Sequence, residues 1–312
     1  MRGEVRIMSP VDSHLLTSDN LHSPCDPGDA GKWGTPPSRR AGDFDYESKT
    51  WGGNEVGLSP KYLNALRLKY CLADLQDVHG RILEVGCGAG GMARAVKSYR
   101  PDLEVHGCDV SRSAIRIAKS RSGRVSYAVC DAYDLAFPEE FFDAVVMFDV
   151  LEHLESPGRA MREIFRVLRD GAIFHLFVPC EGAIGSLHGL LSRVGFKPKE
   201  RYGGHIQRFD GRMVYEMLER NGFVAGEGRW SGYLLYQVAD LAYFSLLQLG
   251  QGAVSTSVEG YVQANGRRMR GRLLGALKDI LSCLTYYESH VLRTLHGWGL
   301  HLSCIKSPLR QS

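Results

Sequence analysis

The stretch Arg81-Ile-Leu-Glu-Val-Gly-Cys-Gly-Ala-Gly-Gly91 decides the fold. Its apolar start predicts a short buried strand that runs into a glycine turn and then into a helix. Gly86, Gly88 and Gly90 allow the backbone to turn tightly and to come close to a ligand. The N-terminal amides of the following helix would point at that ligand. Glu84 precedes the turn, where a carboxylate would face a cation.

This glycine pattern fits more than one template. Gly86-x-Gly88-x-x-Gly91 is the dinucleotide fingerprint, which requires a strand before the glycines and a helix after them. We expect that helix from about Gly90 to Tyr99. A tight strand-to-helix turn alone would also account for the glycines, so the interpretation depends on the sequence that follows.

Strands and helices alternate regularly after the turn. Further strands are predicted over 104–109, 125–130, 142–148 and 172–178, with helical patterns between them. This alternation is typical of an α/β fold with a doubly wound parallel sheet, whose ligand lies at the carboxyl ends of the strands.

Two predicted strands are followed by acidic residues at that edge. Asp109 ends the second strand about 20 residues past the glycines, where an acid can accept hydrogen bonds from both ribose hydroxyls. Asp131 follows the third strand and is placed to accept from the exocyclic amine of an adenine.

Five stretches in this order resemble the class I S-adenosylmethionine-dependent methyltransferases, especially the branch with quinone-biosynthesis and other small-molecule enzymes: LEVGCGAG, HGCDVS, CDAYDLAF, FFDAVVMFDVLEHL and REIFRVLRDGAIFHLFVP. The resemblance covers roughly residues 80–223. It implies a Rossmann-like sheet of seven strands with the last one antiparallel, and S-adenosylmethionine as cofactor. The cofactor-binding residues that it implies are Glu84, Gly86, Gly88, Gly90, Asp109, Asp131 and Phe148.

The resemblance predicts a methyltransferase that acts on a small-molecule, glycan or lipid-linked acceptor. A base is needed only if the acceptor carries a proton at the reacting atom. Because histidine titrates near neutrality, His205 and His153 are the candidate bases. Each could instead bond to a loop, and Asp149 and Glu152 could bind substrate or brace the loop.

Two other functions remain open. A nicotinamide-dependent oxidoreductase would explain Asp109 but has no use for Asp131 or for the stretch DVLEHL. A non-catalytic protein that binds S-adenosylmethionine is the other alternative. A nucleic-acid partner is not expected, because the net charge is only +3 and no Lys/Arg stripe alternates with aromatic residues.

We expect five segments along the chain. They are a disordered leader (1–41), an N-terminal cap segment and helix (42–80), the cofactor-binding core (81–230), an apolar helical insertion (231–296), and the last strand with the C-terminal tail (297–312). In the cap segment, Ser59-Pro60 predicts a helix start. A sixth strand is expected over 223–229.

The insertion contains two apolar segments, Tyr233–Leu249 and Leu273–Leu295. Asp240 lies in the first one, and because a charge near the middle of a membrane span costs roughly 3 kcal/mol, we disfavour a transmembrane helix. A helical hairpin packed on the sheet or against a second subunit is one interpretation. Peripheral contact with a bilayer, or with a lipid-like acceptor, is the other.

The cysteines bear on location and on metals. Cys87, Cys108 and Cys130 fall in or beside predicted core strands, where cysteine behaves as a small apolar residue. They suggest a reducing cytoplasm, with membrane association left open, and the N-terminus has no apolar region typical of a signal peptide. No CxxC pair or zinc spacing is present, so we expect no metal.

Overall fold

The computed structural model describes residues 45–47, 50–121, 124–183, 186–193, 195, 199, 203–249, 269–293 and 295–308. The expected leader, residues 1–41, lies outside the described residues. So does the linker of the insertion over 250–268.

The strands form one sheet in which β1 lies centrally. They are β1 (Arg81–Val85), β2 (Glu104–Asp109), β3 (Val125–Val129), β4 (Phe142–Phe148), β5 (Leu168–Pro179), β6 (Phe223–Ala225), β7 (Arg229–Ser231) and β8 (Gly299–Lys306). Their order is β3-β2-β1-β4-β5-β8-β6, with β7 paired to β8. The pairs from β3 through β5 are parallel, and β8 is antiparallel to β5. The predicted fold class is confirmed.

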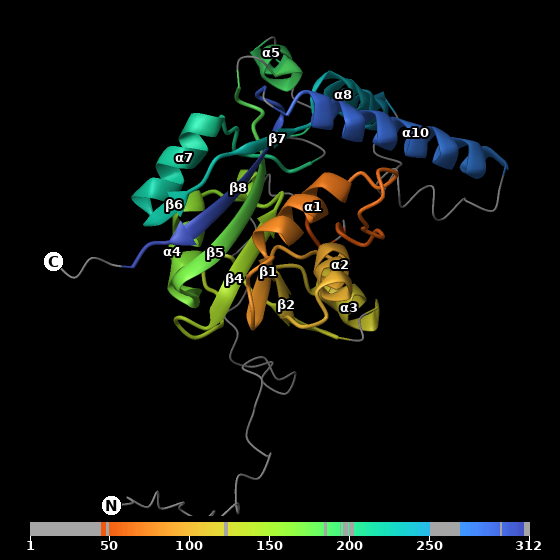
Figure 1. The fold of residues 1–312 in the computed structure, drawn as a ribbon. Coiled ribbons are helices and arrows are strands. Elements are labelled where there is room, and N and C mark those ends of the chain that lie inside the picture. Colours follow the sequence, from red (N-terminus) through yellow and green to blue (C-terminus); the bar gives the residue numbers. More distant parts are fainter. Residues whose placement is uncertain are drawn as a thin grey trace, which may run out of the picture. The chain divides into compact units, whose positions relative to one another are not determined.

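Helices cover both faces of this sheet (Figure 1). They are α1 (Ala65–Asp74), α2 (Gly91–Tyr99), α3 (Arg112–Arg121), the short 3₁₀ helix η2 (Leu151–His153), α4 (Pro157–Val167), α5 (Leu187–Arg193), α7 (Gly211–Arg220), α8 (Leu234–Leu249) and α10 (Met269–Val291). The strand order reverses at β1, and crossovers between parallel strands are right-handed. Therefore α2 and α3 pack on one face and α4 on the other, which leaves the ligand edge open between β1 and β4.

The edge of the sheet beyond β8 differs from the single strand expected over 223–229. β6 pairs with one end of β8 and β7 with its other end, and both pairs are antiparallel. Residues 226–228 between them lie opposite Leu302 and Ser303, so one extra residue forms a bulge. Gly226 still donates its amide to the Ser303 carbonyl at 2.8 Å. The single strand expected over 223–229 is therefore split, and the sheet has eight strands rather than seven.

The first helix begins later than Ser59-Pro60 predicts. Tyr62 donates its amide to the Ser59 carbonyl at 3.0 Å in an isolated turn, and α1 starts only at Ala65. The residues that face the core, which include Leu68 and Cys71, all follow that point. Leu63 is 40% exposed. Packing against the sheet, rather than the capping pair, sets the start of this helix.

The segment between β7 and β8 contains α8 and α10. Figure 1 shows both helices at the end of the sheet to which β5 leads. Among the described helices, none combines the length and apolarity needed to cross a bilayer. α10 buries Ser282, Thr285 and Ser289 but exposes a row of large apolar side chains, Leu273, Leu277, Ile280, Leu284, Tyr287 and Val291.

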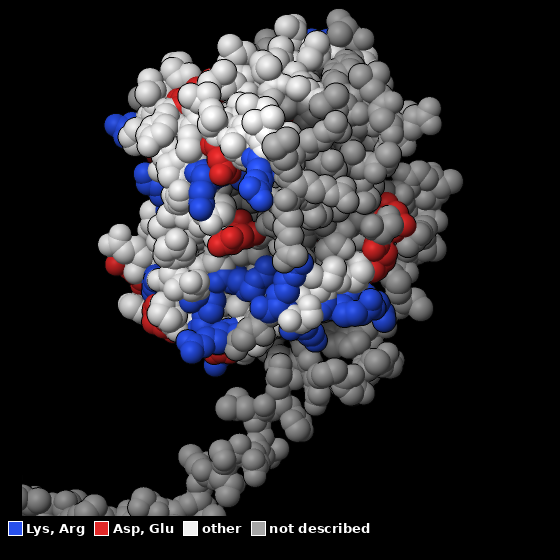
Figure 2. Space-filling view, turned by 90° about the vertical axis from the view of Figure 1, so that its right-hand side faces the viewer, with Lys and Arg blue, Asp and Glu red and all other residues white. Residues whose placement is uncertain are grey.

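Positive charge gathers on the face that carries α2 and α3, as the lower half of Figure 2 shows. The basic residues of α3 are Arg112, Arg116, Lys119 and Arg121. These helices follow β1 and β2, whereas the loops after β4 and β5 form the polar cluster described below. The positive face is therefore separate in sequence and topology from that cluster.

Candidate active site

The glycine turn has the backbone that its sequence predicts. Gly86, Gly88 and Gly90 have φ values of 75°, 51° and 76°, in the region that other residues rarely adopt. A Cβ at Gly88 would lie 2.5 Å from the carbonyl oxygen of Trp51, and one at Gly86 would lie 2.2 Å from Cγ2 of Val150. The turn therefore requires glycine both for its conformation and for the close approach of two other segments.

One of these segments belongs to the N-terminal cap. The carbonyl oxygens of Trp51 and Gly52 accept hydrogen bonds from the Ala89 and Gly91 amides, each at 2.8 Å. The carboxylate of Glu47 accepts the first amides of α3 at 2.8 and 3.0 Å, as acids do at helix N-termini. The cap is thus bonded directly to the glycine turn and to the helix after β2.

Glu84 is a buried acid whose carboxyl is only partly satisfied by hydrogen bonds from the described residues. Its side chain is 4% exposed at the end of β1, and among the described residues Oε2 has no hydrogen-bond partner. Burial raises the pKa of this carboxyl to about 8, although the Ala93 amide acts in the opposite direction. An orphaned buried carboxyl of this kind fits an ammonium group of a ligand.

The other predicted cofactor residues lie along the same edge of the sheet. The Asp109 carboxylate accepts the Gly88 amide at 2.8 Å and the Ser111 amide at 2.9 Å. A carboxylate has about four acceptor positions, so Asp109 can still accept ribose hydroxyls. Asp131 follows β3, and Phe148 is buried at the end of β4. The parallel strands bring all of these residues to one edge, and their cofactor roles remain predictions.

A second group of polar residues follows β4 and adjoins the turn. η2 places Glu152 in the interior, and the carbonyl of Glu152 accepts the Ile206 and Gln207 amides, each at 2.9 Å. The segment after β4 also contains Val150, which packs against Gly86. The loop that carries His205 is therefore tied to the end of β4, next to the glycine turn.

The structure brings the two predicted bases together. The rings of His153 and His205 are in edge contact, with centroids 4.9 Å apart. Nδ1 of His153 lies 3.0 Å from the Gly204 carbonyl oxygen, and Nδ1 of His205 lies 3.2 Å from Oε2 of Glu181. A carbonyl and a carboxylate only accept hydrogen bonds, so both Nδ1 atoms donate.

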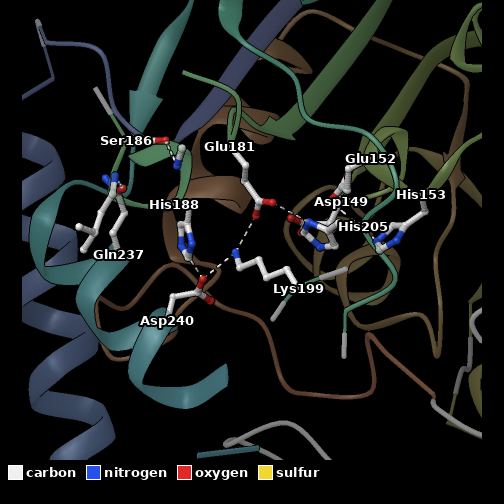
Figure 3. Close-up of polar contacts among 12 residues, drawn as sticks. Asp149, Glu152, His153, Glu181, Ser186, His188, Lys199, His205, Gln237 and Asp240 are labelled. Carbon is white, nitrogen blue, oxygen red and sulfur yellow. Dashed lines mark hydrogen bonds and ion pairs between the residues drawn. The ribbon is translucent and has the colours of Figure 1, made fainter. Parts of the chain in front are cut away.

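A chain of buried charges leads from His205 to the insertion (Figure 3). Glu181, just after β5, pairs with Nζ of Lys199 at 2.8 Å, and Lys199 pairs with Asp240 of α8 at 2.6 Å. Asp240 also lies 2.9 Å from Nε2 of His188 in α5. The insertion thus contributes a carboxylate to the network behind His205.

The pKa values follow from burial and from these pairs. Burial raises the pKa of Glu152 to about 8 and lowers the pKa of His153 to about 4. Burial also acts to lower the pKa of His205, but the neighbouring Glu181 carboxylate outweighs it, and the pKa is raised. Lys199 and His205 hold the pKa of Glu181 below its usual value despite burial.

Sequence reasoning missed Glu181, Lys199, Asp240 and His188. Glu181 follows the end of β5 closely, so the strand-end rule that identified Asp131 could have identified it. Asp240 has a weaker signal, because a lone acid in an apolar helix indicates a buried partner without naming it. No local pattern marks Lys199 or His188.

Comparison with known proteins agrees with this geometry. Residues 83–176 match the family model of a methyltransferase domain. A ubiquinone biosynthesis O-methyltransferase from Alkalilimnicola ehrlichii is 33% identical over 135 residues, which are 41% of this chain and 54% of the relative. The ajmaline N-methyltransferase of Rauvolfia serpentina is 32% identical over 134 residues, 39% of this chain and 44% of the relative. The chain spans about half the length of such relatives.

Solved structures share the fold. The [4+2]-cyclase SpnF superposes with a TM-score of 0.51 at 22% identity, over 78% of this chain and 81% of that chain. The YcgJ protein from Bacillus subtilis gives 0.50 at 16% identity, over 77% and 98% of the two chains. The domain match and the methyltransferase relatives indicate a class I S-adenosylmethionine-dependent methyltransferase domain within this chain, and the solved structures share its fold.

Proposed function

We propose that this protein transfers the methyl group of S-adenosylmethionine to an acceptor that carries an ionisable proton, such as a phenol or a sugar hydroxyl. The acceptor is a small molecule, a glycan or a lipid-linked compound. The observation that carries this proposal is the contact between the segment after β4 and the glycine turn. This contact, together with the edge contact between the His153 and His205 rings, supports a position of Glu152, His153 and His205 near the predicted cofactor site.

In this proposal, the residues at the carboxyl ends of the parallel strands hold the cofactor. Asp109 accepts the ribose hydroxyls, Asp131 accepts from the adenine amine, and Glu84 faces the ammonium group. Gly86, Gly88 and Gly90 allow the cofactor to approach the backbone. When bound, S-adenosylmethionine supplies a methyl group that its sulfonium already activates.

The chain's own residues then orient the acceptor and remove its proton. An imidazole nitrogen of His205 or His153 accepts that proton, and the freed electron pair of the acceptor atom forms a bond to the methyl carbon as the bond from carbon to sulfur breaks. Glu181 fixes Nδ1 of His205 as a donor and leaves Nε2 to face the acceptor. Positioning in a buried site supplies much of the rate.

The experiment is transfer of a labelled methyl group from S-adenosylmethionine to a panel of phenols, glycans, amines and lipid-linked compounds. We expect label in at least one protonated oxygen or nitrogen acceptor, and strong loss of transfer in His205→Gln. Binding of S-adenosylhomocysteine without transfer to any compound would favour a non-catalytic binding protein. SpnF, named a [4+2]-cyclase, has the same fold, so fold alone does not fix the reaction.

The insertion is proposed to contact a bilayer, a lipid-like acceptor or a second copy of the chain. Support comes from α10, which exposes its row of large apolar side chains and buries small polar ones. Exposed apolar rows of this extent indicate an interaction surface. Co-sedimentation with vesicles and the sedimentation coefficient of the free protein separate these partners.

A further inference from the structure

We propose that Glu152, His153 and His205 bind a divalent transition-metal ion of the zinc or cobalt type. One carboxylate oxygen and one nitrogen from each imidazole lie within 4.8 Å of one another. The sequence spacing gave no reason to expect a metal, because Glu152 and His153 are adjacent while His205 is on a separate loop. The fold alone brings the three side chains together.

Glu152 provides an independent observation that points to a bound cation. Its side chain is 1% exposed, and neither carboxylate oxygen has a hydrogen-bond partner within the described part of the chain. The nearest ring nitrogen, Nε2 of His153, lies 3.9 Å from Oε1, beyond hydrogen-bond distance. A buried carboxyl without partners is costly, and a cation between these groups would satisfy it.

Both imidazoles are oriented in the way that metal ligands are. A metal-binding histidine usually donates its other N–H to a carbonyl or carboxylate, which fixes the ring and its tautomer. His153 donates from Nδ1 to the Gly204 carbonyl and His205 donates from Nδ1 to Glu181. Nε2 of each ring is then the atom that is left with a lone pair for an ion.

The backbone holds the site in place without the ion. The Glu152 carbonyl accepts the amides of Ile206 and Gln207, each at 2.9 Å. These bonds join η2 directly to the two residues that follow His205. Glu181, which orients His205, is itself held by Lys199 at 2.8 Å. The ligands therefore need little rearrangement to bind.

The three proposed ligand groups determine which kind of ion the site would prefer. Two imidazoles and one carboxylate suit zinc, cobalt and similar ions, whereas magnesium and calcium prefer all-oxygen sites. Three protein ligands leave at least one position open, as in catalytic rather than structural zinc sites. The open position is where an oxygen of the acceptor would bind.

The role of the ion rests on the proposed function, whereas its binding does not. An acceptor hydroxyl that binds the ion has a lowered pKa and loses its proton to solvent. Its oxygen then forms the bond to the methyl carbon as the bond from carbon to sulfur breaks. When the ion is bound, His153 and His205 hold it and the proton goes to solvent, whereas an imidazole acts as the base only in the metal-free protein.

The test is titration of metal-stripped protein with Co²⁺, followed by its visible d–d absorption. We expect one equivalent to bind without a sulfur-to-cobalt charge-transfer band and to be displaced by Zn²⁺. Glu152→Gln and His205→Gln are each expected to weaken Co²⁺ binding at least tenfold. His290→Gln, an exposed histidine on α10, is the matched control and should bind like the wild type.

Folding and cofactor binding are followed in the same variants. Affinity for S-adenosylhomocysteine shows whether Glu152→Gln and His205→Gln are folded, and His153→Gln provides a third variant if one is not. Absence of Co²⁺ binding by folded wild type, or equal binding by all variants, overturns the proposal. Co²⁺ binding without methyl transfer leaves the metal site standing and contradicts only the proposed function.

Discussion

Gly88 and Gly171 both have left-handed backbones, but their surroundings differ. Gly88 has φ 51° with the Trp51 carbonyl 2.5 Å from its virtual Cβ, whereas Gly171 has φ 75° and nothing within 4 Å. Alanine at either position costs about 1 kcal/mol in backbone strain. Gly88→Ala must also displace the cap from the turn, so we expect a larger loss of unfolding free energy and at least about tenfold weaker binding of S-adenosylhomocysteine.

Gly171→Ala is the matched control for that experiment. Urea denaturation and calorimetry on both variants separate backbone strain from close approach. We expect Gly171→Ala to keep the affinity of the wild type. Equal affinity in the two variants would mean that the turn does not contact the cofactor.

As the proposed partner of the ammonium group, Glu84 is expected to make cofactor binding depend on pH. Burial raises the pKa of Glu84 to about 8, so near pH 7 its carboxyl is protonated in the free protein. A bound ammonium group favours the ionised form, so binding releases a proton below about pH 8. Affinity for S-adenosylhomocysteine should therefore rise as the pH approaches 8 from below.

Proton release is measured by calorimetry at pH 7 in two buffers of different ionisation enthalpy. The wild type should release a proton on binding, and Glu84→Gln should lose that release because an amide has no proton to give. Identical release in the two proteins would exclude Glu84 as the ammonium partner.

The sequence was informative about residues that end strands. Asp109, Asp131 and Phe148 could be placed because the ends of parallel strands share one edge of the sheet. The residues behind Glu181 could not be placed in this way. Lys199 pairs with Glu181, and Asp240 pairs with Lys199, through the packing of separate segments, and no local periodicity encodes those contacts.

At the scale of elements, one buried ion pair joins α8 to the loops after β5. Asp240 has a side chain only 15% exposed and lies 2.6 Å from Lys199. Removing one partner of a buried pair leaves an uncompensated charge and typically costs about 3–5 kcal/mol. We expect Asp240→Asn to lower the unfolding free energy by an amount near that range, measured by urea denaturation.

Asp279→Asn on α10 is the control for that change. Asp279 pairs with Lys278 at 2.8 Å, but its side chain is 47% exposed. Exposed pairs contribute below about 1 kcal/mol. Similar losses in the two variants would show that the Asp240 pair does not anchor the insertion.

Element types were easier to predict than their ends. The alternation of strands and helices after Gly91 predicted the parallel sheet, because the spacing of hydrophobic residues indicates which face of each element is buried. The start of α1 and the bulge between β6 and β7 were missed. The first depends on where the helix meets the core, and the second on pairing with β8, about 75 residues further along the chain.

At the scale of the whole chain, two truncations separate the leader from the cap. Deletion of residues 1–34 is expected to leave the affinity for S-adenosylhomocysteine unchanged. Deletion through Gly53 removes the Trp51 and Gly52 carbonyls that bond the glycine turn, together with Glu47 at the start of α3. We expect this longer deletion to weaken binding at least about tenfold.

Calorimetry and thermal unfolding of both truncated proteins provide the comparison. Loss of folding on the shorter deletion would contradict our interpretation of the leader. Unchanged affinity on the longer one would show that the cap does not support the cofactor site.

The central claim is that the glycine turn and the acids beside it bind S-adenosylmethionine rather than a nicotinamide cofactor. The most direct measurement is calorimetric titration of the purified protein with S-adenosylhomocysteine, with NADH in parallel and Asp109→Ala as the site variant. We predict saturable binding of S-adenosylhomocysteine, none of NADH, and strongly weakened binding in folded Asp109→Ala. Binding of NADH instead, or no binding of S-adenosylhomocysteine by folded wild type, would contradict the claim.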